Sequence, residues 1–231
     1  MCARKTVQKK SSTKQNSENI LALFDPPQED NYYLERNLQQ QGYAVVAGLD
    51  EVGRGPLAGP VVAAAVILPW KCRHSRFLDS KKLTPKKRQT LFEHLYEIPA
   101  HIGIGIVSHT TIDTINILQA SLLAMKRGVM ELSKQGPSPD FLLVDGKFPI
   151  SMTTPQQPLI KGETRSASIA AASIIAKVTR DRIMKDLHIK YPHYNFRQNK
   201  GYPTKEHRQA VKDHGICPFH RLSFKGVKEF V

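Results

Sequence analysis

The sequence predicts an α/β fold with a mixed sheet, helices on the faces of that sheet and a helical appendage at the C-terminus. Two observations indicate this class. Short apolar runs follow one another early in the chain, as in a strand meander, and later runs alternate with helical patterns. With 231 residues, of which 40% are hydrophobic and 23% charged, the chain is long enough to bury a core and has an ordinary globular composition.

The strands are predicted from apolar runs bounded by turn residues. Residues 43–49 and 60–68 form two such runs, and a turn rich in glycine and proline separates them, which indicates adjacent buried strands. Residues 101–107 alternate like a third strand, and residues 141–144 are wholly apolar. The proline-rich stretches 137–139 and 155–158 are interpreted as short loops.

The helices are predicted from apolar residues at helical spacing. Pro85 suits a first helical turn, and Leu91, Leu95 and Ile98 recur on one face, which indicates a helix over 85–98. A long apolar stripe from Ile112 to Leu132 predicts the clearest helix of the chain. Residues 166–190 form a third helix, whose small residues at 170–172 favour close packing.

Charge is the outlier of the composition. The chain has 34 Lys and Arg against 20 Asp and Glu, a net charge of +14 and a pI near 9.8. Residues 1–41 contribute only +1 of this, from six basic and five acidic groups. Residues 185–231 hold ten basic and four acidic groups, so this stretch is the candidate surface for a polyanion such as nucleic acid. A solvated basic face without function is the alternative.

The termini and cysteines indicate a reducing compartment. Cys2, Cys72 and Cys217 are odd in number and lack paired spacing, which argues against a disulfide framework and a zinc ribbon. No apolar run is long enough to span a bilayer, and the basic first seventeen residues lack the apolar stretch of a signal peptide. A transit peptide is the alternative interpretation of these seventeen residues. We expect a cytoplasmic protein with a flexible leader over residues 1–41.

Three acidic residues stand at predicted strand ends. Asp50 and Glu51 follow the first apolar run, and Asp145 follows the run 141–144. Neighbouring strand residues point to opposite faces, so Asp50 and Glu51 converge only if the chain bends, which Gly53 and Gly55 make possible. Carboxylates packed together repel unless a divalent cation holds them, and Mg²⁺ or Mn²⁺ suits an all-oxygen site. A solvated turn is the alternative interpretation.

A longer pattern decides between these interpretations. The stretch Gly48-Leu-Asp-Glu-Val-Gly-Arg-Gly-Pro-Leu-Ala-Gly-Pro60 resembles the signature of ribonuclease HII, and it is long and specific. Further matches to that family follow in the expected order, and the resemblance runs from about Tyr43 to near the C-terminus. These matches are Asp79-Ser-Lys-Lys-Leu83, Asn116-Ile-Leu-Gln-Ala120, Val144-Asp-Gly146, Lys161-Gly162, Ala171-Ala-Ser-Ile-Ile-Ala-Lys-Val-Thr-Arg-Asp181, His193-Tyr194 and Lys200-Gly-Tyr-Pro-Thr204.

The resemblance implies a ribonuclease H-like fold, with a five-stranded mixed sheet, flanking helices and a small helical C-terminal region. We therefore expect a catalytic domain over residues 42–185 and a helical nucleic-acid-binding region over residues 186–231. The implied enzyme is a metal-dependent endoribonuclease that hydrolyses the RNA strand of RNA–DNA hybrids. It also nicks 5′ of single ribonucleotides in duplex DNA, by a two-metal mechanism that gives 3′-hydroxyl and 5′-phosphate ends. It would be a cytoplasmic monomer in ribonucleotide excision repair.

The resemblance also implies the metal ligands. They fall on Asp50, Glu51, Asp145 and the position after Lys161-Gly162, which is Glu163 in this chain and usually Asp in bacterial members. Mg²⁺ or Mn²⁺ is the expected cofactor. Asp181 is the rival for the fourth ligand, although its position beside two arginines in a helix favours a surface ion pair.

Substrate-reading residues are implied in the same way. In the family, the tripeptide Gly53, Arg54 and Gly55 senses a ribose 2′-hydroxyl, and the counterpart of Tyr202 stacks on the deoxyribose that follows it. A basic cluster of the kind that contacts phosphates comprises Lys81, Lys82, Lys86, Lys87 and Arg88.

Three rival functions stay open from the sequence. Paired histidines could act as acid and base without a metal, but His188, His193, His207, His214 and His220 show no motif with a nucleophile and fit surface or core positions better. The other rivals are an HIII-type ribonuclease, which needs longer hybrid tracts, and a non-catalytic binder of hybrids.

Overall fold

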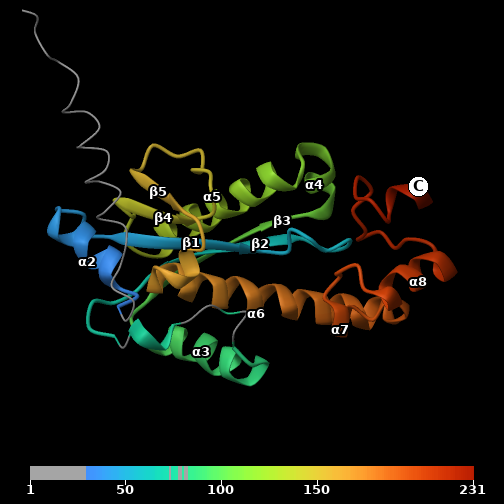
Figure 1. Ribbon diagram of the computed structural model, residues 1–231, viewed down its shortest axis with the longest axis horizontal. Coiled ribbons are helices and arrows are strands. Elements are labelled where there is room, and N and C mark those ends of the chain that lie inside the picture. The colour runs from blue at the N-terminus through green and yellow to red at the C-terminus, as the bar shows by residue number, and fades with distance from the viewer. Residues whose placement is uncertain (1–29, 73, 78–79, 81–82) are drawn as a thin grey trace, which may run out of the picture.

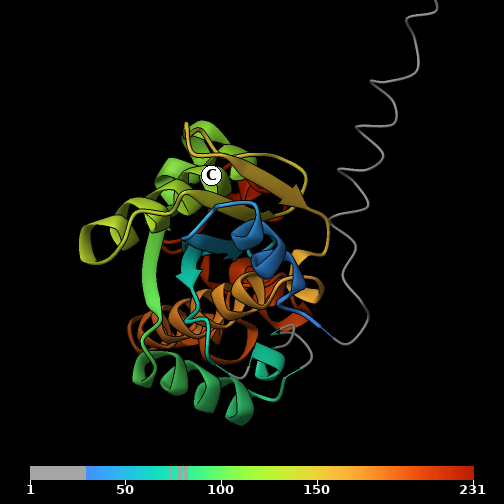
Figure 2. The same cartoon turned by 90° about the vertical axis from the view of Figure 1, so that its left-hand side faces the viewer.

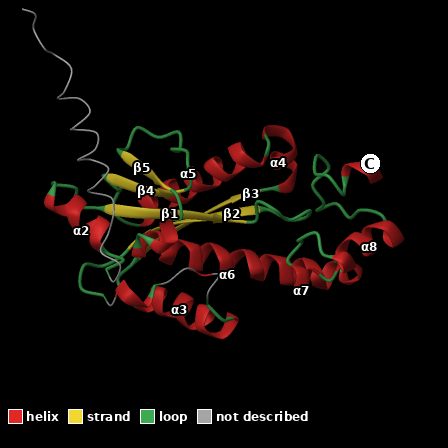
Figure 3. Ribbon diagram, in the orientation of Figure 1, coloured by secondary structure: helices red, strands yellow, loops and turns green. Residues whose placement is uncertain are grey.

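The computed structural model describes residues 30–72, 74–77, 80 and 83–231. Its centre is a five-stranded sheet in the order β3-β2-β1-β4-β5 (Figures 1 and 3). The first three strands pair antiparallel, whereas β4 runs parallel to β1 and β5 runs parallel to β4. The predicted α/β class is thereby confirmed. The strands are β1 (Val46–Val52), β2 (Val61–Ile67), β3 (His101–Val107), β4 (Phe141–Asp145) and β5 (Gln156–Leu159).

Helices cover both faces of this sheet. Helix α5 (Ile117–Gln135) lies on one face and α6 (Ala167–Lys190) on the other, with α3 (Pro85–Glu97) packed outside α6 (Figure 2). The alternation of strand side chains divides the core accordingly. Ala63 and Ala65 of β2 face the α5 side, while Ala64 and Val66 face the α6 side. Both layers therefore hold the central strand β1 from opposite sides.

Small residues let the helices approach the sheet closely. A β-carbon at Gly105 of β3 would overlap the Ala124 carbonyl oxygen of α5. On the opposite face, a β-carbon at Gly48 of β1 would overlap the Ser168 main chain of α6. Because packed interiors tolerate little added volume, these positions fix how each helix lies on the strands.

The C-terminal region adds α7 (Phe196–Asn199) and α8 (Lys205–His214) beyond the end of α6 (Figure 1). Phe196 and Val211 are fully buried and pack with Met184 and Leu187 of α6 in a separate apolar cluster. Helix α6 continues unbroken to Lys190, across the boundary predicted between residues 185 and 186. Helix α6 belongs to both the sheet domain and the C-terminal region, because its last turns contribute Met184 and Leu187 to this cluster.

A helix lies within the described end of the stretch predicted as a leader. Helix α2 (Tyr33–Gln40) buries Leu34 and Leu38 beside β1 and β4, and its Glu35 accepts hydrogen bonds from Ser166 Oγ at 2.6 Å and Ser168 N at 3.0 Å. The stretch 1–41, predicted as a flexible leader, therefore includes this helix packed on the sheet. Residues 1–29 lie outside the described residues.

Two local predictions are corrected. The stripe predicted as one helix is divided into α4 (His109–Ile115) and α5, because Asn116 has a φ of 65° and its side chain accepts from Gln119 N as the cap of α5. The stretch interpreted as a loop over 155–158 largely forms β5, where Pro158 lies next to β4. Among the helices of the described ranges, none is long and apolar enough to cross a membrane.

Gly105→Ala tests the close packing of α5 on β3. We expect it to lower the free energy of unfolding by about 1–3 kcal/mol, since the added methyl group must displace helix backbone. Gly128→Ala on α5 is the matched control, because its β-carbon would make ordinary contacts of 3.4–3.6 Å and alanine favours helix. Urea unfolding of both variants measures the difference, and equal stability would contradict the packing argument.

Candidate active site

The parallel pairing of β1 and β4 brings two acidic side chains together. Its register aligns Leu49 with Val144, so the next residues, Asp50 and Asp145, stand at the same level where β4 ends. Gly48, two residues before Asp50 in β1, packs under α6, so Asp50 points to the α6 face of the sheet. The meeting predicted from the two strand ends is present in the structure.

Glu51 joins them at the same edge. Strand β1 continues past the last residue of β4, and the chain then turns at Gly53, whose φ is 98°. Carboxylate oxygens of Asp50, Glu51 and Asp145 all lie within 4.8 Å of one another. The main-chain N–H of Glu51 donates to Asp50 Oδ1 at 2.7 Å. The turn at Gly53 comes directly after the two carboxylates, whereas β1 stays paired with β2 through Val52.

This crowding changes the protonation of the carboxyl groups. Burial, followed by the charges of Glu51 and Asp145, raises the pKa of Asp50 well above its ordinary range, and a hydrogen bond from Ser173 only partly offsets this. Burial and the charge of Glu163 raise the pKa of Asp145 to about 7. Without a cation, the site therefore does not hold all its carboxylates ionised at neutral pH.

The donor set fits a hard divalent cation. Three convergent carboxylates supply only oxygen ligands, which Mg²⁺ and Mn²⁺ prefer, and no sulfur or imidazole joins this group among the described residues. A bound dication would remove the repulsion that raises both pKa values. The metal-binding prediction for Asp50, Glu51 and Asp145 is consistent with this geometry.

Glu163 lies next to this group but outside it. It belongs to a 3-10 turn, Gly162–Thr164, that follows β5, and Lys161 enters the turn with a φ of 55°. Gly162 N donates to Asp145 Oδ1 at 2.7 Å, which fixes the turn against the site. The charge of Glu163 acts on both Asp145 and Asp50, so its side chain faces the same place.

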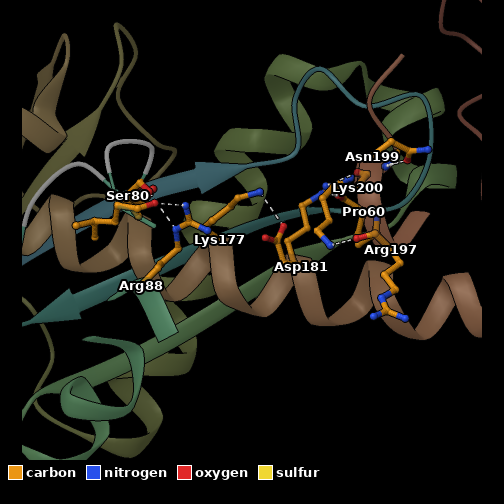
Figure 4. Close-up of polar contacts among 12 residues, drawn as sticks. Pro60, Ser80, Arg88, Lys177, Asp181, Arg197, Asn199 and Lys200 are labelled. Atoms are coloured by element: carbon orange, nitrogen blue, oxygen red, sulfur yellow. Dashed lines mark hydrogen bonds and ion pairs between the residues drawn. The ribbon is translucent and has the colours of Figure 1, made fainter. Parts of the chain in front are cut away.

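Asp181, the rival fourth ligand, makes an ion pair instead. Its Oδ1 accepts from Lys177 Nζ at 2.7 Å, one turn earlier on α6 (Figure 4). Figure 4 also labels Arg197 and Lys200. The charges of Asp181 and Arg197 both act on Lys200. The structure does not bring Asp181 into the group formed by the three convergent carboxylates.

Serine hydroxyls connect Asp50 to the loop before α3. Ser173 of α6, which lowers the pKa of Asp50 by hydrogen bonding, is also 2.6 Å from Ser80 Oγ. Arg88 of α3 donates to the carbonyls of Ser80 and Leu83 at 3.0 and 2.9 Å (Figure 4). Arg88 was predicted within the basic cluster for phosphates, but its guanidinium anchors this loop internally.

Two buried arginines hold the glycine-rich loop after β1. Arg180 of α6 donates to the carbonyls of Pro60, Ala58 and Lys200 at 2.9–3.0 Å. Arg221 donates to the carbonyls of Gly53, Arg54 and Gly59 at 2.6–3.1 Å. Both side chains are fully buried, and burial lowers the pKa of Arg180 to about 10 and that of Arg221 to about 9.

Tyr202 lies beside Gly55 of the tripeptide. Its ring atom Cε1 is 3.5 Å from the place where a β-carbon on Gly55 would stand, and 40% of the residue is exposed. Leu57 N donates to Gly201 O at 2.7 Å, which joins the two loops. The Arg54 side chain points back to the site and pairs with Glu51 at 3.3 Å. The residues predicted to recognise the sugars of the substrate therefore form one surface beside the carboxylates.

The predicted basic cluster is only partly visible. Lys81 and Lys82 lie outside the described residues, so the structure neither supports nor contradicts their predicted contact with nucleic acid. Lys86 and Lys87 are exposed in the first turn of α3, on the same helix as Arg88. These two lysines stay available for phosphate contacts.

Sequence reasoning missed the residues that position the site. Ser173, Arg180, Arg221 and the buried His207 and His220 were not predicted as functional positions. Most of the carbonyls that Arg180 and Arg221 contact lie at least 120 residues earlier in the chain, and Lys200 lies 20 residues after Arg180. No local sequence pattern separates a buried arginine from an exposed one. The small residues around Ser173 were the available signal, since they show that this helix face is buried.

Comparisons with known proteins agree with this geometry. Residues 47–227 match the ribonuclease HII family. A ribonuclease HII of Desulfotalea psychrophila is 60% identical over 212 residues, which are 92% of this chain and 94% of that protein. One from Listeria monocytogenes serotype 4b is 49% identical over 227 residues, covering 98% of this chain and 85% of that protein.

A solved structure extends the match to three dimensions. The ribonuclease H2 of Pyrococcus horikoshii OT3 is 28% identical and superposes with a TM-score of 0.65, covering 80% of this chain and 96% of that one. The family match spans the sheet, the three convergent carboxylates and the C-terminal region that carries Tyr202. The chain therefore belongs to the ribonuclease HII family, and it is a metal-dependent endoribonuclease.

Proposed function

We propose that this enzyme cuts the RNA strand of RNA–DNA hybrids and nicks duplex DNA on the 5′ side of a single embedded ribonucleotide. The products would carry 3′-hydroxyl and 5′-phosphate ends. The observation that supports this specificity is the contact of Tyr202 with Gly55, beside the carboxylates. If the tripeptide reads a 2′-hydroxyl and Tyr202 reads the following deoxyribose, their contact forms one surface for the junction between RNA and DNA.

Four carboxylates would hold the metal ions in a two-metal mechanism. Asp50, Glu51 and Asp145 form the convergent group, and Glu163 faces it from the turn after β5. We propose Mg²⁺ or Mn²⁺, since both accept an all-oxygen ligand set. Bound ions of this kind lower the pKa of an attacking water and stabilise the leaving 3′-oxygen.

The chain itself supplies position and charge. Gly162 N and Ser173 hold Asp145 and Asp50 by hydrogen bonds, so the carboxylates stay converged although they repel. Gly55 lacks a β-carbon, which allows a sugar to approach the main-chain amides of the loop. At Gly53 the missing β-carbon leaves room for the Arg180 side chain, which packs against the loop from inside. We propose that the lysines at 81, 82, 86 and 87 and the basic region 186–231 contact phosphates, which position a duplex without reading its sequence.

A duplex with one ribonucleotide tests the function directly. It is incubated with the enzyme in EDTA, in Mg²⁺ and in Mn²⁺, and the cut ends are mapped. We expect a nick 5′ of the ribonucleotide only with metal. Poor cutting of this duplex with efficient cutting of a long hybrid would favour the HIII type of specificity. A gel shift without any nick would indicate a non-catalytic binder.

Asp50→Asn and Asp145→Asn test the metal site. We expect each to reduce nicking by at least about two orders of magnitude while binding of the hybrid is retained, because the basic surface is unchanged. Unfolding in EDTA is the control for folding. Each substitution removes one of the repelling charges, so neither metal-free variant should be less stable than the parent protein. Full activity of either variant would disprove the assignment.

Glu163 and Asp181 are separated by three variants. We expect Glu163→Gln to cost orders of magnitude in rate, since a neutral amide is a poorer ligand for a hard dication, while Glu163→Asp retains substantial activity. Asp181→Asn should remain active and lose at most about 1 kcal/mol of stability with its ion pair to Lys177. Rates at several metal concentrations provide the comparison. An active Glu163→Gln with an inactive Asp181→Asn would assign the fourth ligand to Asp181.

Tyr202→Ala tests how the junction is read. A ring that recognises the following deoxyribose matters only where RNA meets DNA. We therefore expect cutting at a single ribonucleotide to fall more than cutting within a long RNA tract, which lowers the ratio of the two rates. Measuring kcat/KM on both substrates gives this ratio. Equal losses of kcat/KM on both substrates would indicate that Tyr202 contributes only to general binding.

A further inference from the structure

Two buried histidines form a hydrogen-bonded pair behind Tyr202. His207 of α8 and His220 of the C-terminal loop are 0% and 1% exposed, and their Nε2 atoms lie 3.1 Å apart. At one end, Cys217 N donates to His220 Nδ1 at 3.0 Å. At the other end, His207 Nδ1 lies 2.9 Å from the carbonyl oxygen of Tyr202. The pair thus connects a main-chain donor to a main-chain acceptor.

The two ends fix the direction of every bond. His220 Nδ1 lies 3.0 Å from Cys217 N and 3.3 Å from Cys217 O, and the shorter contact is with an amide nitrogen, which can only donate, so His220 Nδ1 accepts and its Nε2 carries the proton. That Nε2–H donates to His207 Nε2, which leaves the His207 proton on Nδ1, facing the Tyr202 carbonyl. A carbonyl can only accept, so the last bond is satisfied as well. Both rings are neutral in this arrangement, each as a single tautomer.

The surroundings favour this neutral pair. The ring of Tyr194 lies edge-on to His220 at 4.9 Å, and Phe196 lies perpendicular to His207 at 5.3 Å. Burial lowers the pKa of both histidines, that of His220 to about 4. A proton on His207 Nε2 would face the Nε2–H of His220 and break their bond, so this bond requires a neutral His207. The Cys217 N–H that faces His220 Nδ1 disfavours a second proton on that ring, which keeps His220 neutral as well.

The chain of bonds ends at the residue that faces the substrate. Tyr202 N donates to Asn199 O at 2.9 Å, and its carbonyl accepts from both Thr204 N at 2.8 Å and His207 Nδ1 at 2.9 Å, so both main-chain groups of Tyr202 are held. Gly201 before it, with a φ of 81°, is joined to Leu57. The direction of the Tyr202 ring over Gly55 depends on this fixed main chain.

We propose that His207 and His220 are positioning residues that fix the main chain of Tyr202, and thereby orient its ring for reading the junction between RNA and DNA. This inference rests on the proposed role of Tyr202. The pair touches no reacting atom and acts only through Tyr202. A pair that merely fills the C-terminal core would affect all substrates alike, whereas a positioning pair affects the junction substrate more.

The tautomers are tested first, on the intact protein without substitution. Nitrogen-15 NMR of the histidine side chains at pH 7 should show His207 protonated at Nδ1 and His220 protonated at Nε2, with His207→Asn and His220→Asn used for assignment. A charged imidazolium in either ring would overturn the inference, because the pair would then not be neutral. The opposite tautomer of His207 would overturn it as well, because Nδ1 could then not donate to Tyr202.

Two substitutions of His207 separate its two bonds. The amide of asparagine reaches the position of Nδ1 and can still donate to Tyr202 O, whereas the amide of glutamine reaches the position of Nε2 and keeps only the bond to His220. We expect His207→Gln to lower the ratio of single-ribonucleotide to long-tract cutting about threefold to tenfold, as for one lost hydrogen bond. His207→Asn should restore most of that ratio. His214→Asn is the control, since His214 is an exposed histidine of the same helix stacked on His193 at 4.6 Å.

A double substitution completes the test. In the Tyr202→Ala background, His207→Gln should cause no further fall in the ratio, because the ring that it positions is gone. If Tyr202→Ala lowers the ratio but His207→Gln does not, the positioning inference fails and the proposed function stands. If Tyr202→Ala itself leaves the ratio unchanged, the proposed role of Tyr202 fails, and the inference fails with it. Equal ratios for the asparagine and glutamine variants would also overturn the inference.

Discussion

The parallel register of β1 and β4 forces Asp50 and Asp145 into one partly buried place, and much of the surrounding structure holds them there. Two like charges 4.8 Å apart cost roughly 3–4 kcal/mol at an effective dielectric constant near 20. A loose scaffold would relieve this by moving apart. The close contacts of Gly48 under α6 and of Gly105 under α5 leave the strands no room to do so. The two carboxylates therefore stay close together, and a bound cation would remove their repulsion.

The same rigidity extends to the loop that follows β1. Burying a guanidinium is costly unless its donors are satisfied, and Arg180 and Arg221 satisfy theirs with main-chain carbonyls of residues 53–60 and of Lys200. Each arginine therefore fixes several carbonyls at once. Because Arg180 also reaches Lys200, the loop, α6 and the segment before Tyr202 form one connected unit.

The residues proposed to read the substrate and those proposed to bind metal consequently belong to different parts of the fold. The carboxylates stand on the sheet, whereas Tyr202 belongs to the C-terminal region and meets Gly55 only because that region packs on the end of α6. Met184 of α6 lies under both Gly59 and Gly201 at this junction. Changes in the packing of this cluster would move Tyr202 relative to Gly55 before they alter the carboxylate group on the sheet.

The sequence by itself determined the elements with strong local periodicity and the positions at their ends. Apolar runs predicted β1 to β4, and the acidic residues directly after them predicted that Asp50, Glu51 and Asp145 would meet. The glycines at 53 and 55 indicated the turn after β1, and the long motif indicated the family. These features are local, so a window of a dozen residues contains their cause.

Only the tertiary structure decided the rest. Strand β5 has a weak local pattern and forms because β4 offers it a partner, and Asn116 divides a continuous apolar stripe through one residue with positive φ. Glu35, Arg180 and the pair of His207 and His220 are polar residues in buried positions. Their partners lie between 3 and 133 residues away along the chain. A polar residue is buried only when the fold supplies its hydrogen-bond partners, and no local pattern contains that information.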